Sequence, residues 1–426
     1  MNYDWKKIVL RVTVGNIINF YSFVLYGCFS QIISQLFFPT FDHFVAMMLT
    51  FGVFATGYLI RPVGALFFGY MGDRFGRKKA LLLSIMMVTF TTTAFGLLPT
   101  YHQIGAYAPF LLILCRLLQG VSMSGEETAA AVFLSEISPK NRQGLAGSII
   151  LSGVYIGLLL GSIMAFIMTS IIPQNDLVTW GWRIPFLLSF FFGVGAILLR
   201  RKQAESISFM QAKAHHLLVK NPVAEVILTQ GKTVIKGILA TTTLAVAGYL
   251  FAIYIPSQLN TQFGIQTSML VCSLSFFIIA IFVVLVGLWV DKIGFKWPTV
   301  LSCVGFIIFS YPIFFLLSKQ TIWSALLAEF ILLILLGLSA GSLMPMLIQS
   351  FPVHTRLSGV SIAFNFSMTL FGSTAPLLAL YLTKLLNTPI APFICLMGAA
   401  LLTLFSLYYT KHDKNHIQFE SLPIAS

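Results

Sequence analysis

The sequence contains little charge, and acidic residues are its scarcest charged kind. Asp and Glu number 13 against 26 Lys and Arg, and the four types together make up 9% of the 426 residues. A soluble domain carries about 25% charged residues. With 58% hydrophobic residues and a mean hydropathy of +0.90, the composition excludes an ordinary soluble domain and predicts an all-α membrane protein.

Cysteine and metal-binding motifs are also scarce. The chain has five cysteines, all in apolar runs and without a C-x-x-C pair, so we interpret them as small packing residues. The histidines form no H-E-x-x-H motif, and we expect no metal and no cofactor. The net charge of +13 does not indicate a nucleic-acid partner, because the basic residues lie in short gaps between apolar runs rather than on one polar domain.

Long apolar runs make up most of the chain. Each is close to the roughly 20 residues that cross a ~30 Å hydrocarbon core as a helix, and they predict about twelve transmembrane helices in two pseudo-symmetric six-helix bundles. The expected spans are 11–36, 44–71, 80–99, 108–135, 145–172, 183–200, 237–258, 268–290, 298–318, 323–350, 358–385 and 391–410. The expected parts are an N-terminal bundle (1–200), a linker (201–236), a C-terminal bundle (237–410) and a short tail (411–426).

The positions of the basic residues predict the orientation. Most of them lie in segments that an even number of crossings places on one side, and basic segments remain in the cytoplasm. We therefore expect a multi-pass protein of the inner membrane with both termini cytoplasmic. The linker either carries a short amphipathic helix along the membrane surface or is a plain tether. Lys6 and Lys7 precede a run long enough to span, which indicates a retained first helix rather than a cleaved signal.

A charged turn occurs twice, roughly half the chain apart. Its first copy begins at Gly69 and its second, degraded copy at Gly287, each with Gly, Asp, a cation, Gly and a second cation in that order. A dinucleotide-binding loop would need a preceding β-strand, whereas a helix-length apolar run precedes this turn. The duplication predicts two related bundles that rock against each other.

The turns predict latches between the halves. The carboxylate of Asp73 is placed to cap a helix of the opposite half, with Leu357-Ser358-Gly359 as the candidate start. Asp291 would do the same near Gly144, and Arg77 would pair with Glu136. The alternative is that the cations only set the orientation. The candidate latch residues are Gly69, Asp73, Arg74, Gly76, Arg77, Glu136, Asp291 and Lys292.

Ionisable residues inside spans are costly and are usually functional. Arg61 can pair with Glu126 or with Glu127, but adjacent helical residues point ~100° apart, so one glutamate at most faces it well. The other would reach the cavity or another polar partner. Either both glutamates are structural, or one carries a proton.

Two further charged residues and several uncharged ones complete the candidate site. Arg116 suits a carboxylate ligand or a charge switch, or it bonds to Gln119 or to a backbone carbonyl. Glu329 is either a complementary carboxylate of the second half or a group that reaches the outer interface. The candidate substrate or coupling residues are Arg61, Arg116, Gln119, Glu126, Glu127, Asn19, Tyr21, Ser22, Glu329 and Asn365.

Several of these stretches resemble a known family. The turn from Gly69 to Lys78 and the run Arg116-Leu117-Leu118-Gln119-Gly120 are similar to motifs of the major facilitator superfamily. Arg61-Pro62-Val63-Gly64, Gly125-Glu126, the run from Trp180 to Phe186, and Phe351-Pro352 with Arg356 and Gly359 resemble its metabolite:proton symporter branch, which includes proline/betaine, citrate, 2-oxoglutarate and shikimate carriers.

This resemblance implies a secondary transporter rather than an enzyme. It would move a small polar metabolite with a proton by alternating access, as a functional monomer. The run from Arg11 to Pro39 and Pro99-Thr100-Tyr101 look most like citrate carriers, which favours an organic acid. A proline/betaine symporter, or a uniporter or exporter of the superfamily, is the alternative. The branch's two first-helix acids are absent, because Asn19 and Ser22 stand in their place, so any proton coupling would use other residues.

Overall fold

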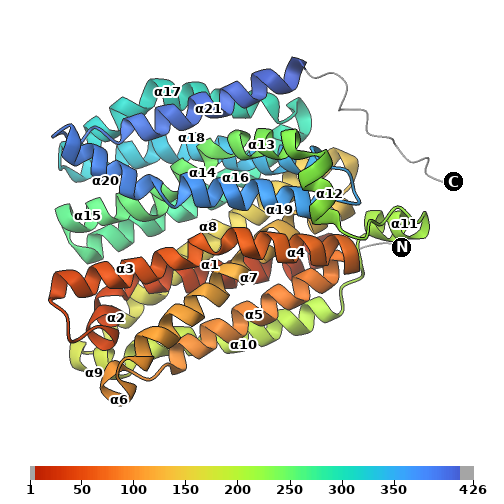
Figure 1. The fold of residues 1–426 in the computed structure, drawn as a ribbon. Coiled ribbons are helices and arrows are strands. Elements are labelled where there is room, and N and C mark those ends of the chain that lie inside the picture. Colours follow the sequence, from red (N-terminus) through yellow and green to blue (C-terminus); the bar gives the residue numbers. More distant parts are fainter. Residues whose placement is uncertain (1–4, 413–426) are drawn as a thin grey trace.

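A computed structural model describes residues 5–412 (Figure 1). The described chain is a bundle of long, roughly parallel helices joined by short turns. Eleven segments in this range are long and apolar enough to cross a membrane, and a twelfth apolar helix, Phe393–Tyr409, is shorter. The prediction of an all-α membrane fold with about twelve spans in two bundles is confirmed. Residues 413–426 of the expected tail lie outside the described residues.

The first half, at the bottom of Figure 1, contains ten α-helices and two short 3₁₀ turns. They are α1 Trp5–Cys28, α2 Ser30–Phe37, α3 His43–Leu59, α4 Arg61–Phe75, α5 Arg77–Leu97, α6 Tyr101–Ile104, α7 Tyr107–Ile137, η1 Lys140–Arg142, α8 Gln143–Ile171, α9 Gln174–Thr179, η2 Gly181–Arg183 and α10 Ile184–Arg201.

Two short helices connect it to the second half, which lies at the top of Figure 1 and includes two π-helical turns. The elements are α11 Ile207–Ala214, α12 Pro222–Thr229, α13 Gly231–Ala240, α14 Thr242–Tyr249, η3 Leu250–Tyr254, α15 Ile255–Phe263, α16 Ile265–Ile293, α17 Lys296–Ser318, α18 Ile322–Gln349, α19 Arg356–Ser367, η4 Met368–Gly372, α20 Ala375–Leu385 and α21 Phe393–His412.

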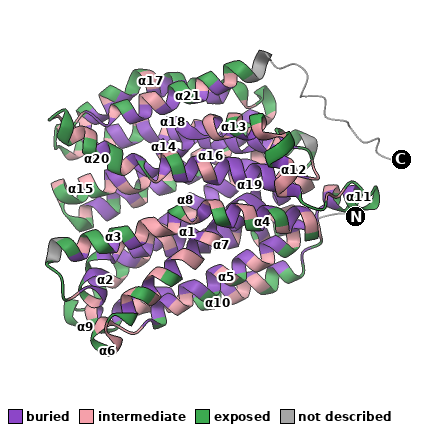
Figure 2. Ribbon diagram, viewed as in Figure 1, coloured by how far each residue is buried: buried purple, intermediate pink, exposed green. Residues whose placement is uncertain are grey.

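Burial follows the membrane arrangement. Figure 2 shows buried residues concentrated where the two halves meet, along α8, α16 and α19, with exposed residues on the outer helices. The exposed residues include large apolar side chains such as Phe90 and Trp323, which are 69% and 78% exposed. Such a surface fits contact with lipid, and it leaves the interior between the halves for polar groups.

Two expected span boundaries are wrong. The span expected at 11–36 ends at Cys28, and α2 follows after Phe29, whose φ of −96° and ψ of 12° leave helical geometry. Hydropathy does not detect this bend because both segments are apolar. The span expected to begin at 237 starts at Gly231. The expected start was too late because the first turns of this helix carry Lys232 and Lys236, and the charge pattern assigned both lysines to the linker.

A proline divides the expected second span into α3 and α4. Pro62 lacks the N–H that would bond to the carbonyl of Tyr58, four residues earlier. The hydroxyl of Thr369, on η4 of the second half, donates to that carbonyl at 3.1 Å. The broken backbone is thus satisfied from the opposite half, and the break places Arg61 at the first turn of α4.

The two π-helical turns also lie close to prolines. Pro256 follows η3 at the start of α15, and Pro376 follows η4 at the start of α20. A π-helical turn is rare and often lies at a functional site. Both turns contribute residues to the larger of two cavities between the helices, described below.

The charged turns end their helices in the same way. Gly76 after α4 has φ of +113°, and Gly294 after α16 has φ of +81°. This left-handed region is unfavourable for residues with a Cβ atom and is readily adopted by glycine. In each copy the glycine follows the aspartate by three residues, so the repeat in the sequence is a repeat in backbone geometry.

Candidate substrate site and the junction between the halves

Asp73 lies against the N-terminus of α19 in the opposite half. Its carboxylate accepts hydrogen bonds from the backbone N–H groups of Leu357 and Ser358, at 3.2 and 2.7 Å. These N–H groups have no partner within their own helix, and the helix dipole favours a negative charge there. Gly69 makes the close approach possible, because a Cβ atom at this position would lie 2.8 Å from the Cα atom of Ser358.

Asp291 makes the matching contact in the second copy. Its carboxylate accepts from the N–H groups of Gly144 and Leu145 at the start of α8, at 2.6 and 3.0 Å. Each half thus places an aspartate on the N-terminus of a helix in the other half. The side chain of Lys292 is exposed at the end of α16.

Arg77 and Glu136 form a bidentate pair beside Asp73. Two guanidinium nitrogens of Arg77 bond to the two carboxylate oxygens of Glu136, both at 3.1 Å. Arg77 also donates across the junction to the carbonyl of Val353 at 2.6 Å, and Arg356 of the second half bonds to Glu136 at 3.3 Å. Planar bidentate pairs of this kind add geometric specificity as well as energy.

The remaining latch candidates contact the linker. Arg74 donates to the carbonyl of Val219 at 3.2 Å. At Gly76, a Cβ atom would lie 2.2 Å from a carboxylate oxygen of Glu205, which accepts from the N–H of Lys78. We name the end of the bundle that holds these contacts the charged end.

Arg61 pairs with Glu127 rather than with Glu126. Its Nη2 lies 2.9 Å from Oε2 of Glu127. From the same side chain, Nε donates to the amide oxygen of Asn365 at 2.9 Å and Nη1 donates to the hydroxyl of Tyr249 at 3.3 Å. Asn365 and Tyr249 belong to the second half, so this guanidinium bridges the two halves deep inside the bundle.

Glu126 faces the opposite side of α7 and pairs with Arg200. Two nitrogens of Arg200 contact the two carboxylate oxygens of Glu126, and the hydroxyl of Ser84 also donates to this carboxylate. Arg200 is one of the basic residues whose positions predict the orientation, but its side chain is only 2% exposed, so it also holds the helices of the first half together. The sequence did contain a clue to the Glu126–Arg200 pair. A buried glutamate that does not face Arg61 needs another positively charged partner.

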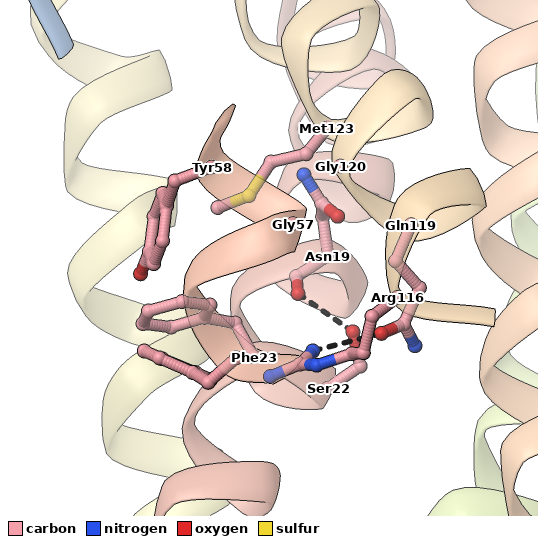
Figure 3. Close-up of a pocket in the computed structure, with 10 residues that line it drawn as sticks. Asn19, Ser22, Phe23, Gly57, Tyr58, Arg116, Gln119, Gly120 and Met123 are labelled. Atoms are coloured by element: carbon pink, nitrogen blue, oxygen red, sulfur yellow. Dashed lines mark hydrogen bonds between the residues drawn. The ribbon is translucent and has the colours of Figure 1, made fainter. Parts of the chain in front are cut away.

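Arg116 points into a small cavity between the helices of the first half (Figure 3). Its Nη1 donates to the side chain of Gln119 at 2.8 Å, and its guanidinium carbon lies 3.7 Å from the ring centre of Tyr26. Within the described structure, Nε and Nη2 of Arg116 are buried without a hydrogen-bond partner, and so is the amide nitrogen of Asn19 in the same cavity. Buried donors without partners are rare in proteins, so this cavity is suited to a ligand that accepts hydrogen bonds.

A larger cavity adjoins it at the junction of the halves. Phe23, Tyr58 and Met123 line both cavities, while Arg61 and Glu127 line the larger one, which contains about 600 Å³ of space between protein atoms, open solvent included. The remaining lining residues of the larger cavity are Phe20, Leu151, Val154, Tyr155, Leu158, Leu244, Gly248, Tyr249, Ala252, Ile253, Phe364 and Met368. Both halves contribute residues to this lining.

Comparison with known proteins identifies the family. The sequence matches the profile of the Major Facilitator Superfamily over residues 15–376, with a second match over 237–423. The chain belongs to the Major Facilitator Superfamily. It is thus a multi-pass membrane transporter that handles a small-molecule substrate, and it is not an enzyme.

Two relatives with similar sequences are named as proline/betaine transporters. The chain is 29% identical to the proline/betaine transporter of Escherichia coli (strain K12) over 433 residues, which cover 99% of this chain and 86% of that protein. It is 33% identical over 392 residues, 91% of this chain and 84% of the other, to a Staphylococcus aureus (strain COL) protein that carries the provisional name of proline/betaine transporter.

Solved structures of the superfamily share the fold. A double tryptophan mutant of XylE has a TM-score of 0.81 at 16% identity, covering 96% of this chain and 95% of that one. The proton:xylose symporter XylE bound to a bromodeoxyglucose has a TM-score of 0.77 at 14% identity, with the same coverage. At these identities the likeness establishes the fold alone.

Among the predicted site residues, the structure brings Asn19, Ser22, Arg116 and Gln119 to the small cavity and Arg61 and Glu127 to the larger one. Asn365 accepts a hydrogen bond from Arg61 but lines neither cavity itself, and three others lie elsewhere. The hydroxyl of Tyr21 donates to the carbonyl of Pro185 in α10 at 3.0 Å, Glu126 pairs with Arg200, and Glu329 accepts a hydrogen bond from Ser275 within the second half. Each points from a helix face that packs against a neighbour, so none of the three lines either cavity.

Sequence reasoning missed the aromatic side chains of the cavities. Phe23 and Tyr58 have ring centres 5.4 Å apart, and Tyr58 lies 4.9 Å from Tyr249 of the second half. The sequence contains 40 Phe and 14 Tyr, so composition does not distinguish these rings from those that face lipid. Tyr58 and Tyr249 each carry a hydroxyl that requires a partner inside a span, but this signal does not separate them from the other tyrosines of the spans.

Proposed function

We propose that this chain imports a small zwitterion of the proline/betaine class together with a proton, by alternating access between its two halves. The names of its relatives support this substrate class better than the organic acid that the first-helix resemblance favours. The comparisons therefore favour the alternative substrate over the main expectation from the sequence.

The charge balance of the cavities carries the proposal. Two guanidinium groups line them, but Arg61 is compensated by Glu127 at 2.9 Å. Arg116 has no carboxylate within hydrogen-bonding distance among the described residues, and two of its nitrogens lack a partner. One uncompensated guanidinium suits a ligand with one carboxylate. A polycarboxylate such as citrate would bring two or three negative charges into a site that offers one free positive group.

The aromatic wall suits the other end of a zwitterion. Phe23 and Tyr58 form the boundary that the two cavities share. A carboxylate at Arg116 would place a neighbouring quaternary or secondary ammonium group beside these rings, whose faces attract cations. The larger cavity adds the ring of Tyr249 from the second half, so one ligand would contact both halves.

The orientation follows from the distribution of positive charge. The charged end carries the turn after α4 and the linker, and basic segments remain in the cytoplasm. We place this end in the cytoplasm, with the protein in the inner (plasma) membrane. Residues 1–200 and 237–410, the latter extended to Gly231, are the two moving bodies. The contacts of Asp73 and Asp291 close the cytoplasmic side in this state, and breaking them would open it.

Reconstitution in proteoliposomes tests the proposal. Labelled betaine and labelled proline should accumulate when the outside is more acidic than the inside, and unlabelled citrate in excess should not compete. Uptake of labelled citrate with no uptake of either zwitterion would contradict the substrate class. Equal accumulation with and without the pH gradient, at matched membrane potential, would contradict the symport.

A further inference from the structure

Glu127 is the one carboxylate among the described residues that line either cavity. The two first-helix polar residues in the small cavity, Asn19 and Ser22, cannot bind a proton in this way. A proton that travels with the substrate needs a titratable acceptor that both sides of the membrane can reach in turn. Within the described cavities Glu127 meets this requirement.

The other carboxylates buried among the spans lie outside the cavities. Both oxygens of Glu126 are bound by Arg200, and the hydroxyl of Ser84 adds a further hydrogen bond. Glu329 is held by Ser275 between α16 and α18. Neither lines a cavity, which leaves Glu127 as the candidate acceptor among the three.

The groups around Glu127 would respond to a change in its charge. The charged or titratable groups that line the same cavity are Arg61 from α4, Tyr58 from α3, Tyr155 from α8 and Tyr249 from α14. Arg61 is the one cation among them. Its side chain and that of Glu127 are 2% and 5% exposed, and a buried pair of this kind interacts more strongly than a pair at the surface.

Arg61 connects this pair to the second half. The same guanidinium that bonds to Glu127 also donates to Asn365 and Tyr249. We propose that Glu127 carries the coupled proton, and that Arg61 transmits its change of charge to the junction between the halves. This inference rests on the proposed zwitterion symport.

The steps balance as one proton and one substrate. A proton from the outer solution adds to the carboxylate of Glu127, which becomes a neutral acid. The charge of Arg61 is then uncompensated, although its nitrogens still donate to Asn365 and Tyr249, and this added positive charge raises the affinity of the cavities for the one carboxylate at Arg116. When the cytoplasmic side opens, Glu127 releases the proton to the cytoplasmic solution and pairs again with Arg61. The affinity falls and the substrate leaves. Proton and substrate thus strengthen each other's binding, as linkage requires.

The test measures betaine binding as a function of pH in the purified full-length protein. Wild-type affinity should strengthen as the pH falls, by at most about tenfold per pH unit for one coupled proton. Glu127→Gln should bind betaine with an affinity that does not depend on pH. In proteoliposomes this variant should exchange labelled for unlabelled betaine but should not accumulate it under a pH gradient. Glu329→Gln makes the same substitution at a buried carboxylate outside the cavities, and it should behave as the wild type.

The outcomes separate this inference from the proposed function. If the wild type does not bind or exchange betaine or proline, the proposed function fails. If the wild type exchanges betaine but Glu127→Gln still accumulates it under the gradient, this inference alone fails. Loss of both exchange and accumulation in a monodisperse Glu127→Gln protein would also overturn it, because Glu127 would then be needed for translocation itself. If Glu127→Gln does not fold, Glu127→Asp decides: a shifted pH dependence of binding supports the inference, and an unchanged one overturns it.

Discussion

The carboxylate of Asp73 lies 2.7 Å from the backbone nitrogen of Ser358, across the junction between the two halves. The contact joins the end of one transmembrane helix to the start of another that is nearly 300 positions later in the chain. Asp291 repeats it on Gly144 at 2.6 Å. An anion at a helix N-terminus stabilises by electrostatics and by satisfying N–H groups, so each contact favours the state in which the two halves are closed at the charged end.

Asp73→Ala should shift the protein toward the state that is open to the cytoplasm. Loss of a capping carboxylate costs about 0.5–2 kcal/mol, which favours the open state by roughly two- to thirtyfold. Spin labels at Lys79→Cys and Lys296→Cys, on exposed positions where α5 and α17 begin at the charged end, report the separation of the halves. In a background without the native cysteines, the long-distance population should grow. Asp291→Ala should act in the same direction, and an unchanged distance distribution in both variants would contradict the latch.

Gly69→Ala should open the same end by a steric route. A Cβ atom at this position would lie 2.8 Å from the Cα atom of Ser358, so α4 and α19 would have to separate. The same spin-label pair should show a larger open population, and betaine transport should slow. Gly195→Ala in α10 is the matched control, since a Cβ atom there meets nothing within 4 Å. Equal behaviour of the two variants would show that the close approach of α4 and α19 is not needed.

Arg200→Ala should destabilise the first half far more than Arg201→Ala does. Arg200 is 2% exposed, pairs with Glu126, and donates to the carbonyls of Val12 and Leu81, whereas its neighbour Arg201 is exposed. Removing one partner of a buried ion pair costs about 3–5 kcal/mol, while an exposed substitution stays within about 0.5 kcal/mol. Thermal unfolding of the two variants in the same detergent measures the difference. Similar midpoints would contradict a structural role for the Glu126–Arg200 pair.

The overall architecture could be predicted because a membrane constrains sequence strongly. Spanning helices need long apolar runs, and basic residues lie mainly on one side of the membrane. The number of spans could therefore be predicted from the sequence. The recurrence of the charged turn, with Asp291 in the place of Asp73, could be predicted as well. The bend at Phe29 could not be predicted, because both helices that meet there are apolar. The start of the seventh span was also misplaced, since Lys236 lies in a helix whose beginning hydropathy alone places too late.

The charged members of the candidate site and the polar residues Asn19, Ser22 and Gln119 could be predicted, whereas the cavity aromatics Phe23 and Tyr58 could not. A charge in a span is rare, so Arg61, Arg116 and Glu127 stood out individually. The choice between Glu126 and Glu127 as partner of Arg61 depends on helix rotation, which the sequence does not fix to within the ~100° that separates neighbours. The sequence did not single out the cavity residue Tyr58, because aromatic residues that face lipid and aromatic residues that face a cavity cannot be told apart by residue type.

Tyr58→Leu should weaken betaine binding while Tyr58→Phe should retain it. The ring of Tyr58 belongs to the wall that both cavities share, and a cation on an aromatic face gains about 0.5–2 kcal/mol. Calorimetric titration should therefore show a loss of roughly two- to thirtyfold in affinity for the leucine variant alone. If both variants bind as the wild type does, the ammonium group lies elsewhere. If both lose affinity equally, the hydroxyl rather than the ring face contributes.

Arg116→Ala should remove most of the affinity for a carboxylate-bearing substrate. Its guanidinium has two nitrogens without a partner beside the cavity, and hydrogen bonds to a charged group contribute about 1.5–3 kcal/mol. The dissociation constant of betaine should therefore rise roughly ten- to 150-fold. Arg116→Lys should recover only part of this loss, because an ammonium group keeps the charge but not the planar fork.

Arg183→Ala is the control for the loss of a guanidinium, because Arg183 donates to the carbonyls of Gly96 and Leu98 and lines neither cavity. Its affinity for betaine should match that of the wild type. Choline, which carries the same ammonium group without a carboxylate, separates the two ends of the ligand. Whatever affinity the wild type has for choline should persist in Arg116→Ala, while Tyr58→Leu should reduce it. An Arg116→Ala protein that is folded and binds betaine with unchanged affinity would refute the carboxylate site, since no other guanidinium among the described cavity residues is free of a carboxylate partner.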